Sequence, residues 1–417
     1  MLGGAAGARQ RRRPWGEEGT ITLTISQRLA PAADASLASV TRARNAWIEV
    51  DLGALDANVA ALRSFLGSGL EIIAVVKANA YGAGAEGLAP ALEAAGVDRF
   101  AVVWPVEALQ LRRYGVTRPI VVLGHAFPED APAAVAAAVT LTCHSLALGE
   151  ALSRAAVEQG RVAAVHVKVD TGLHRFGLDI DAAVALATAL RALPGLHVEG
   201  LTTHMANADE EDDSFAEQQN ARFAGAARRL PWIPYRHTAN SATALRRSEL
   251  RYDGVRIGLA LHGVLPANTA GPDVRPILSL KARLARVAEV PAGDGVSYGL
   301  SWRAKRDSRV GLVPVGYADG WRRSLGNVGR VLIGGRPCPV AGRLCMDQFL
   351  VDVTALLDAA EGDEVVLLGE QGGERITAAE IATLTGTIPW DIFASLQARL
   401  PRIFHRGGVV TSILEPA

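Results

Sequence analysis

The chain has 417 residues, of which 49% are hydrophobic and 21% charged, a composition typical of globular proteins with full hydrophobic cores. Its 43 basic and 43 acidic residues balance, so the protein has no net charge that would favour binding to nucleic acid or to an acidic membrane. Three cysteines, Cys143, Cys338 and Cys345, indicate a reducing compartment rather than a disulfide framework, and no His/Cys spacing suggests a metal site. No apolar run approaches the roughly 20 residues that span a bilayer, so we expect a cytoplasmic protein.

The first 44 residues differ in composition from the rest. An arginine run at 11–13 is followed by PWGEE, not by the apolar stretch of a signal peptide, and residues 30–36 (APAADAS) are small and polar. We expect residues 1–44 to form a mostly disordered extension.

The next part of the chain alternates short β-branched runs with helical patterns. After a strand-like run at 46–52 and a helical pattern at 53–66, the runs lie at 72–76, 101–103, 120–123, 140–142, 165–169, 197–203, 235–238 and 253–256. Helical patterns at 86–95, 105–114, 146–159, 181–193 and 214–230 separate most of them. About eight strand-then-helix units over roughly 190 residues match a (β/α)8 barrel. A doubly wound open sheet is the rival, but no G-x-G-x-x-G follows the first strand.

The pattern changes after residue 276. Strand-like runs at 278–290, 310–315, 330–333 and 364–368 are joined by turns, and a short helix at 378–384 and an arginine-rich end complete the chain. We therefore predict an α/β protein with a TIM-like barrel at 45–275 and a mostly antiparallel β domain at 276–417. The strand at 46–52 is a candidate to join the second domain.

Several reactive side chains fall at predicted strand ends, where the functional residues of such barrels gather. They are Lys77, Lys168, His204, His237, Ser241 and Arg256. Each also has an ordinary interpretation, such as a solvated strand-end lysine, a core histidine or an arginine in an ion pair. Their convergence from separate strands favours a functional site.

Lys77 suggests Schiff-base chemistry. A lysine in a desolvated pocket becomes a nucleophile toward carbonyl groups, including the aldehyde of pyridoxal 5'-phosphate (PLP). Barrels commonly bind phosphate after strands seven and eight. Asn240 and Ser241 open a helix there, and Gly258 and Leu259 follow the eighth strand. These loops offer a phosphate cradle, so PLP is a candidate cofactor.

From residue 46 to its end, the sequence resembles alanine racemases in several motifs. They are 74–82 (AVVKANAYG), 168–172 (KVDTG), His204 with 208–210 (ADE), 239–241 (ANS), 255–258 (VRIG), 295–299 (GVSYG), 316–320 (GYADG) and 342–348 (GRLCMDQ). The resemblance implies a homodimeric, PLP-dependent enzyme that interconverts L- and D-alanine and supplies D-alanine for peptidoglycan. Lys77 would bind PLP and act as one base, and Tyr298 of the second subunit would be the other.

The resemblance also implies roles for further residues. Tyr81, Ser241 and Trp390 would contact the phosphate, with Asn240, Gly258 and Leu259 beside them. Arg256 would face the pyridine nitrogen, supported by His204 and His237. Lys168 matches a lysine that is often carbamylated, and its carbamate would hold Arg175. Met346 and Tyr317 would line the substrate site and its entrance, with Asp347 supporting them.

This arrangement suits racemisation, because inverting an α-carbon needs one base on each face. An arginine does not give up its proton, so the cofactor ring would stay unprotonated and would be a weaker electron sink. Barrel-type PLP decarboxylases use a carboxylate at that position, so Arg256 argues against them.

Four residues depart from the family pattern. Ala83 replaces a histidine, His174 a glycine or asparagine, His262 a tyrosine, and Trp390 a tyrosine at the entrance. The last change predicts an altered entrance and leaves open a racemase of serine or of larger amino acids. A rival of another class is a non-catalytic PLP-binding barrel protein, but such proteins lack the β domain.

Overall fold

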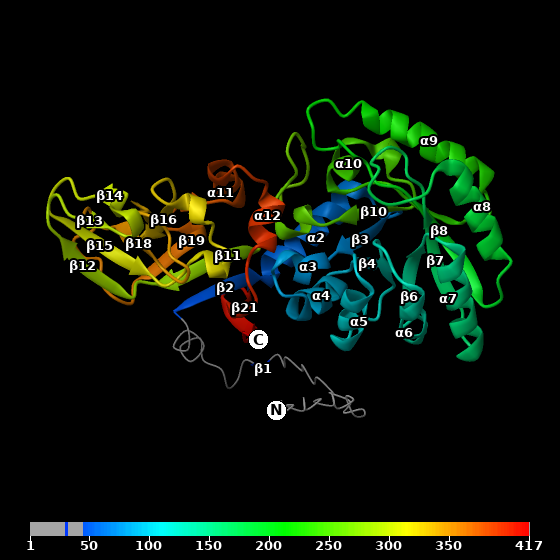
Figure 1. Ribbon diagram of the computed structural model, residues 1–417, viewed down its shortest axis with the longest axis horizontal. Helices are drawn as coiled ribbons and strands as arrows, with labels where there is room; N and C mark the ends of the chain where they lie inside the picture. The colour runs from blue at the N-terminus through cyan, green and yellow to red at the C-terminus, as the bar shows by residue number, and fades with distance from the viewer. Residues whose placement is uncertain (1–29, 32–44, 417) are drawn as a thin grey trace, which may run out of the picture.

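The computed structural model describes residues 30–31 and 45–416. An α/β barrel, on the right in Figure 1, is followed by a mostly antiparallel β domain on the left, which confirms the predicted fold class. The prediction for residues 1–44 lies outside the described residues, apart from β1 (Ala30–Pro31), which pairs with β22 (Val409–Leu414).

Eight parallel strands form the barrel, and each lies within two residues of its predicted run. They are β3 (Glu71–Val75), β4 (Arg99–Val102), β5 (Ile120–Val122), β6 (Val139–Cys143), β7 (Ala163–Lys168), β8 (Leu196–Thr202), β9 (Tyr235–His237) and β10 (Gly254–Ile257). β10 pairs with β3, and backbone hydrogen bonds from Asp253 N to Arg236 O and from Arg256 N to Ala239 O (both 3.0 Å) join β9 to β10. The ring is thereby completed.

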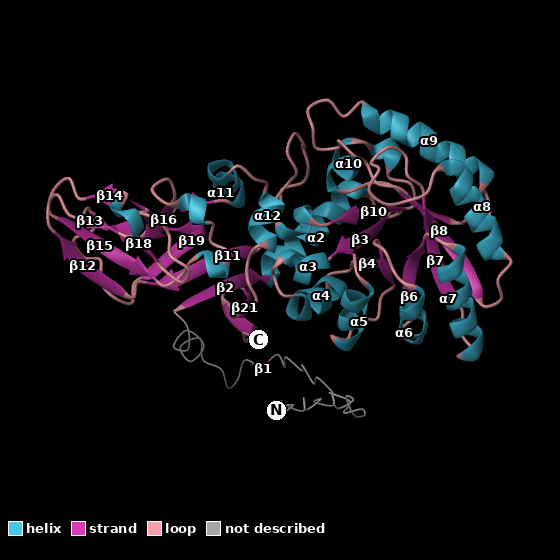
Figure 2. Ribbon diagram, viewed as in Figure 1, coloured by secondary structure: helices cyan, strands magenta, loops and turns pink. Residues whose placement is uncertain are grey.

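Helices surround the barrel strands (Figure 2). They are α2 (Leu52–Leu66), α4 (Ala85–Ala94), α5 (Pro105–Arg113), α6 (Ala131–Ala136), α7 (Leu146–Glu158), α8 (Ile180–Arg191), α9 (Phe215–Arg229) and α10 (Ser241–Arg246). The side chains of Asp51, Ser145 and Asp179 accept backbone N–H groups at the starts of α2, α7 and α8, which fixes where these helices begin. With helices outside and side chains filling the inside, the strands are buried on both faces, which explains their continuous apolar runs.

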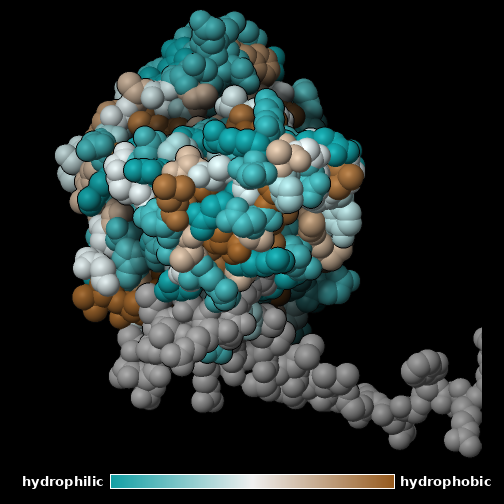
Figure 3. All heavy atoms as spheres, turned by 90° about the vertical axis from the view of Figure 1, so that its left-hand side faces the viewer, coloured by the Kyte–Doolittle hydropathy of each residue, from teal (hydrophilic) through white to brown (hydrophobic). Residues whose placement is uncertain are grey.

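The β domain consists of a large sheet, a smaller sheet and a hairpin. The large sheet has the order β1-β22-β21-β2-β11-β19-β16-β17, with β20 on β19; the small one has the order β12-β15-β18; β13 pairs with β14. Their bounds are β2 (Ala46–Asp51), β11 (Leu278–Arg283), β12 (Arg286–Val290), β13 (Gly295–Val296), β14 (Trp302–Arg303), β15 (Ser308–Val313), β16 (Arg330–Ile333), β17 (Arg336–Pro339), β18 (Phe349–Asp352), β19 (Glu364–Gln371), β20 (Glu374–Ile376) and β21 (Arg402–Arg406), with helices α11 (Ala378–Thr385) and α12 (Pro389–Ala394). Viewed from the β-domain end of the molecule, the surface is largely hydrophilic, with small groups of hydrophobic residues (Figure 3).

Two parts of the β domain differ from the sequence-based expectation. The run at 278–290 is two strands, β11 and β12, in different sheets. The arginine-rich end forms β21 and β22, and β21 pairs in parallel with β2 from the start of the described chain. A local pattern carries no information about so distant a partner, so the pairing of β21 with β2 had no recognisable signal.

The two units pack closely where β21 meets α4. A Cβ added to Gly87 on α4 would lie 2.4 Å from the ring of Phe404 on β21. Only a residue without a side chain permits this contact. The C-terminal strand is therefore packed directly against the first helices of the barrel.

Candidate active site

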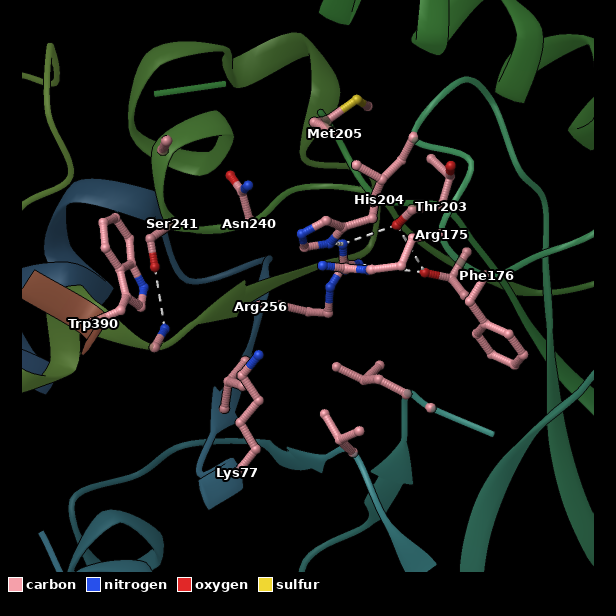
Figure 4. Close-up of a pocket in the computed structure, with 18 of the residues that line it drawn as sticks. Lys77, Arg175, Phe176, Thr203, His204, Met205, Asn240, Ser241, Arg256 and Trp390 are labelled. Carbon is pink, nitrogen blue, oxygen red and sulfur yellow. Dashed lines mark hydrogen bonds between the residues drawn. The ribbon is translucent and has the colours of Figure 1, made fainter. Parts of the chain in front are cut away.

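A cavity of about 820 Å³ opens where the barrel strands end (Figure 4). The structure brings together there eleven of the residues singled out from the sequence. They are Lys77, Tyr81, Lys168, Arg175, His204, Asn240, Ser241, Arg256, Gly258, Leu259 and Trp390. Trp390 comes from α12 of the β domain, so both units line the cavity.

Lys77 begins an unusual turn. It follows β3 and opens α3 (Lys77–Tyr81), in which Ala78, Asn79 and Ala80 have φ of 53–55° and ψ of 48–52°. Tyr81 also has φ of 53°. This left-handed backbone costs about 1–2 kcal/mol per non-glycine residue. The turn lets Lys77 point into the cavity, as Figure 4 shows, and Tyr81, which is buried, also lines the cavity.

The environment of Lys77 makes its amine a better nucleophile. Burial lowers the pKa of Lys77, and the nearby Arg175 guanidinium lowers it further, whereas Glu107 acts in the opposite direction. A lowered pKa increases the fraction of neutral amine at neutral pH. The neutral amine is the form that adds to a carbonyl group.

Arg256 lies buried across the cavity from Lys77. It donates hydrogen bonds to His237 Nδ1 (2.8 Å), His204 Nδ1 (3.0 Å) and the carbonyl oxygens of Thr203 and Thr238. Burial lowers the pKa of Arg256 to about 10, so it still holds its proton at neutral pH. The guanidinium is therefore a fixed donor.

A chain of hydrogen bonds extends from Arg256 through the barrel. His237 Nε2 lies 2.9 Å from His166 Nδ1, His166 Nε2 lies 3.1 Å from Glu199, and Glu199 accepts from Arg99 at 2.7 Å. Because Arg256 donates to His237 Nδ1, the two neutral imidazoles can each donate onward, from His237 to His166 and from His166 to Glu199.

The charges along this chain follow from its surroundings. Burial and then Arg256 lower the pKa of His237 well below its ordinary value, so that ring stays neutral. Burial raises the pKa of Glu199, but hydrogen bonds and charge from His166 and Arg99 outweigh it and hold the value at about 2. His166, Glu199 and Arg99 were not among the residues expected from the sequence. His166 could have been found, because it lies two residues before Lys168 and alternate strand residues share a face.

His204 is held neutral in the same way. Burial comes first among the causes that lower its pKa, followed by the charge of Arg256. A neutral imidazole with one nitrogen occupied by Arg256 offers a flat, apolar ring face to the cavity.

The other end of the cavity suits a phosphate. Asn240 caps α10 by accepting from Thr243 N (2.9 Å), and Ser241 Oγ accepts from Gly258 N (3.1 Å). A Cβ added to Gly258 would lie 2.4 Å from Tyr81 Oη, so the glycine preserves a small space between backbone N–H and hydroxyl donors.

PLP fits these residues. The hydroxyl groups and Gly258 backbone would bind its phosphate, Lys77 would bind its aldehyde carbon, and Arg256 would face its ring nitrogen. One end of the cavity thus offers hydrogen-bond donors for the phosphate, and the other end offers a donor for the ring nitrogen.

Lys168 lies between cations. Burial, then Arg256 and Arg175, lower the pKa of Lys168 to about 8, while Asp170 acts in the opposite direction. Its ammonium lies 5.2 Å from the ring centroid of Phe176. The geometry leaves Lys168 and Arg175 as two cations at one side of the cavity.

Four of the predicted residues lie away from the cavity, and His237 is buried behind Arg256. Tyr298 opens η4 (Tyr298–Leu300) and is 67% exposed, and Tyr317, on η5 (Tyr317–Asp319), and Met346 are also exposed. Asp347 accepts from Arg399 at 2.6 Å. Within one chain, these β-domain residues do not meet Lys77.

The departures from the family pattern have different surroundings. Ala83 is fully buried, His262 is buried with Nε2 2.9 Å from Ala80 O, and Trp390 lines the cavity. His174 is exposed and adopts φ of 54°, and its N–H donates to Asp170. Trp390 therefore acts on the site directly, whereas His262 acts on it through the backbone of Ala80.

Comparisons with known proteins agree with this geometry. The family models for the N-terminal and C-terminal domains of alanine racemase match residues 50–266 and 277–404. "Alanine racemase 2" of Caldanaerobacter subterraneus is 39% identical over 370 residues, covering 87% of this chain and 95% of its own. Alanine racemase of Geobacillus kaustophilus is 39% identical over 379 residues, with the same coverage of 87% and 95%.

Solved structures are similar over the same length. Alanine racemase from Bacillus anthracis with bound L-Ala-P has a TM-score of 0.83 at 36% identity, covering 89% of this chain and 98% of that one. That of Clostridium difficile 630 in complex with cycloserine has a TM-score of 0.82 at 32% identity, with coverage of 89% and 98%. The chain belongs to the alanine racemase family.

Proposed function

We propose that the protein is a PLP-dependent amino-acid racemase that interconverts L- and D-alanine. The observation that carries the proposal is Lys77 pointing into a cavity whose far side holds the buried, proton-retaining Arg256. The rivals are not favoured: a non-catalytic PLP-binding barrel protein would not explain the match to the C-terminal domain. The relatives named above are alanine racemases, so a preference for serine or larger amino acids is not favoured.

Bound PLP would withdraw electrons from the α-carbon of an amino acid and so acidify its α-hydrogen. Lys77 would move a proton at Nζ on one face of that carbon. Arg256 would keep its own proton and donate a hydrogen bond to the ring nitrogen. His237 and His204 hold Arg256 in this orientation through their Nδ1 atoms.

The second proton-transfer group is Tyr298 of a second subunit. Tyr298 is exposed in the single chain, and the large apolar side chains of Leu300, Tyr317 and Met346 are exposed as well. Exposed apolar surface of this kind is typical of interfaces between chains. In a two-fold homodimer each β domain would cover the barrel mouth of the other subunit, which would exclude water from both sites.

Lys168 is the proposed site of a carbamate. The lowered pKa of Lys168, about 8, raises the fraction of neutral amine that can react with CO₂. The new N–C bond would form with loss of one N–H proton to solvent, and the resulting anion beside Arg175 would remove the repulsion between the two cations. Arg175 would then be fixed to bind the substrate.

The domain division and cellular role are also proposals. We assign residues 45–275 to the barrel and 276–417 to the β domain; the pairing of β2 with β11 and β21 supports placing the first strand with the latter. In the part of the chain that the structure describes, no helix has the length and apolarity to cross a membrane. A cytoplasmic enzyme that supplies D-alanine for peptidoglycan is the proposed context.

A substrate panel tests the activity. Purified protein with PLP should exchange the α-hydrogen of alanine for deuterium and abolish the optical rotation of either enantiomer. Serine and larger amino acids should react more slowly than alanine. Absence of exchange with every small amino acid, although PLP is bound, would contradict the enzyme assignment.

A further inference from the structure

The turn after Lys77 needs external support. Ala78, Asn79, Ala80 and Tyr81 are consecutive non-glycine residues with positive φ, whereas the other such residues in the described part of the chain are isolated from one another. This conformation places each Cβ against the next carbonyl oxygen, so the surrounding structure must hold it.

Two barrel residues hold the start and middle of the turn. Glu107 Oε1 accepts from Ala78 N at 2.7 Å, and its other oxygen accepts from backbone N–H groups at the end of β4. His262 Nε2 donates to Ala80 O at 2.9 Å. Both contacts tie the turn to neighbouring barrel loops.

Arg402, on β21 of the β domain, holds the end of the turn. Its Nε and Nη2 atoms donate to the carbonyl oxygen of Gly82 at 3.2 and 3.0 Å. The same guanidinium donates to the carbonyl oxygens of Leu396, Gln397 and Leu400 at 2.6–3.1 Å. Arg402 is 2% exposed, so a network of buried carbonyl groups depends on one cation.

These bonds join two distant parts of the molecule. Residues 396–400 directly follow α12, which carries Trp390 into the cavity. Figure 1 shows α12 and β21 beside α3 and α4. The guanidinium therefore links the segment that lines one wall of the cavity to the turn that carries Lys77.

We propose that Arg402 is a positioning residue that holds the left-handed turn and thereby directs Lys77 and Tyr81 into the cavity together. It touches neither substrate nor cofactor. The C-terminal strand is thus part of the support of the reactive lysine. This inference rests on the proposed role of Lys77 as the lysine that binds PLP.

Arg402→Lys tests the proposal in the full-length protein. Lysine keeps the charge but cannot reach four carbonyl groups from one nitrogen. The dissociation constant for PLP, measured by absorbance titration, should rise at least about tenfold because the turn loses charge-assisted hydrogen bonds. An unchanged constant would overturn the proposal.

Arg112→Lys is the matched control. Arg112 also donates to four carbonyl groups, those of Val116, Arg118, Ala137 and Ala138, which precede β5 and β6 at the other end of the barrel. This variant should lower the melting temperature and leave the PLP dissociation constant unchanged. A similar weakening of PLP binding in both variants would indicate a general loss of structure and would contradict a positioning role.

Rescue separates positioning from stability. Ala78 is exposed, and Ala78→Gly relieves the left-handed backbone without removing buried contacts. Added to Arg402→Lys, it should recover roughly fivefold of the lost PLP affinity. No recovery would contradict the idea that Arg402 supports a strained turn.

A second variant covers the case in which Arg402→Lys fails to fold. A Cβ on Gly82 would lie 2.3 Å from Phe393 O, so Gly82→Ala should move the turn away from Arg402 while the other three carbonyl partners remain. PLP binding should weaken as before, and an unchanged dissociation constant for PLP would overturn the proposal.

Lys77→Ala tests the underlying assignment separately. If a covalent PLP adduct still forms in this variant, the proposed role of Lys77 is wrong, whatever the result for Arg402.

Discussion

The two halves of the candidate site are built in opposite ways. In the barrel half, Arg256, His237 and His204 are buried and hydrogen-bonded, and burial keeps the two imidazole rings neutral. In the β-domain half, Tyr298 and Met346 are exposed and lie outside the cavity. The residues proposed to bind the cofactor thus lie together within one chain, whereas the proposed second base would come from another chain. By these proposals, a single subunit would bind PLP, and racemisation would require two subunits.

The largest effect should come from the barrel half. Lys77→Ala removes both the group that binds PLP and one base, so racemisation should fall at least about 10⁴-fold, measured by a chiral assay of alanine. Lys281→Ala is the control, because Lys281 pairs with Glu49 in the β domain at 2.9 Å. Activity of the Lys77 variant within tenfold of the parent would refute its assignment.

The next largest effect should come from the β-domain half. Tyr298→Phe removes a proton-transfer group, so kcat should fall about 10²- to 10⁴-fold while PLP binding is retained. An unchanged kcat in both directions would exclude the two-base assignment.

Mixing the two inactive variants tests whether Tyr298 acts in the partner's site. Randomly reassociated Lys77→Ala and Tyr298→Phe subunits should regain about a quarter of the parent activity, because about half of the dimers are hybrids with one intact site. If Tyr298 instead completes the site of its own chain, the mixture stays inactive.

A smaller effect concerns Lys168 at the edge of the barrel half. Removing CO₂ should lower kcat/KM by up to about tenfold, since the carbamate acts only by placing Arg175. The pKa of Lys168 is lowered to about 8, so at constant dissolved CO₂ the reactivation rate should rise with pH and level off above about pH 8. A rate that keeps rising toward pH 10 would indicate an ordinary lysine.

The smallest effect is expected at the entrance, where both units meet. Trp390→Tyr should change kcat/KM for alanine by less than about tenfold, because it alters the shape of one wall and leaves both bases in place. Trp232→Tyr is the control, since Trp232 packs on Arg191, 4.7 Å away, on the outside of the barrel. Equal kinetic parameters for Trp390→Tyr and the parent would show that the entrance is not altered.

Particular residues show how far the sequence leads. The apolar runs of β3 and β5 identify barrel strands because burial on both faces leaves a local pattern. Lys77 and Arg256 are recognisable because strand ends in a barrel converge. The left-handed turn at 78–81 has no such signal: its residues, Ala-Asn-Ala-Tyr, contain no glycine, and the side chains of Glu107, His262 and Arg402, all distant in sequence, help to hold it.

The sequence alone determined the order of the barrel strands, the family resemblance and the residues at the mouth of the barrel. Tertiary structure decided the neutral state of His237, the path from Arg256 to Glu199, the burial of Arg402 and the distance of Tyr298 from the cavity. The reason is physical. Strand and helix patterns depend on neighbours in the chain, whereas pKa values and buried hydrogen bonds depend on groups such as Gly82 and Arg402, which are 320 residues apart.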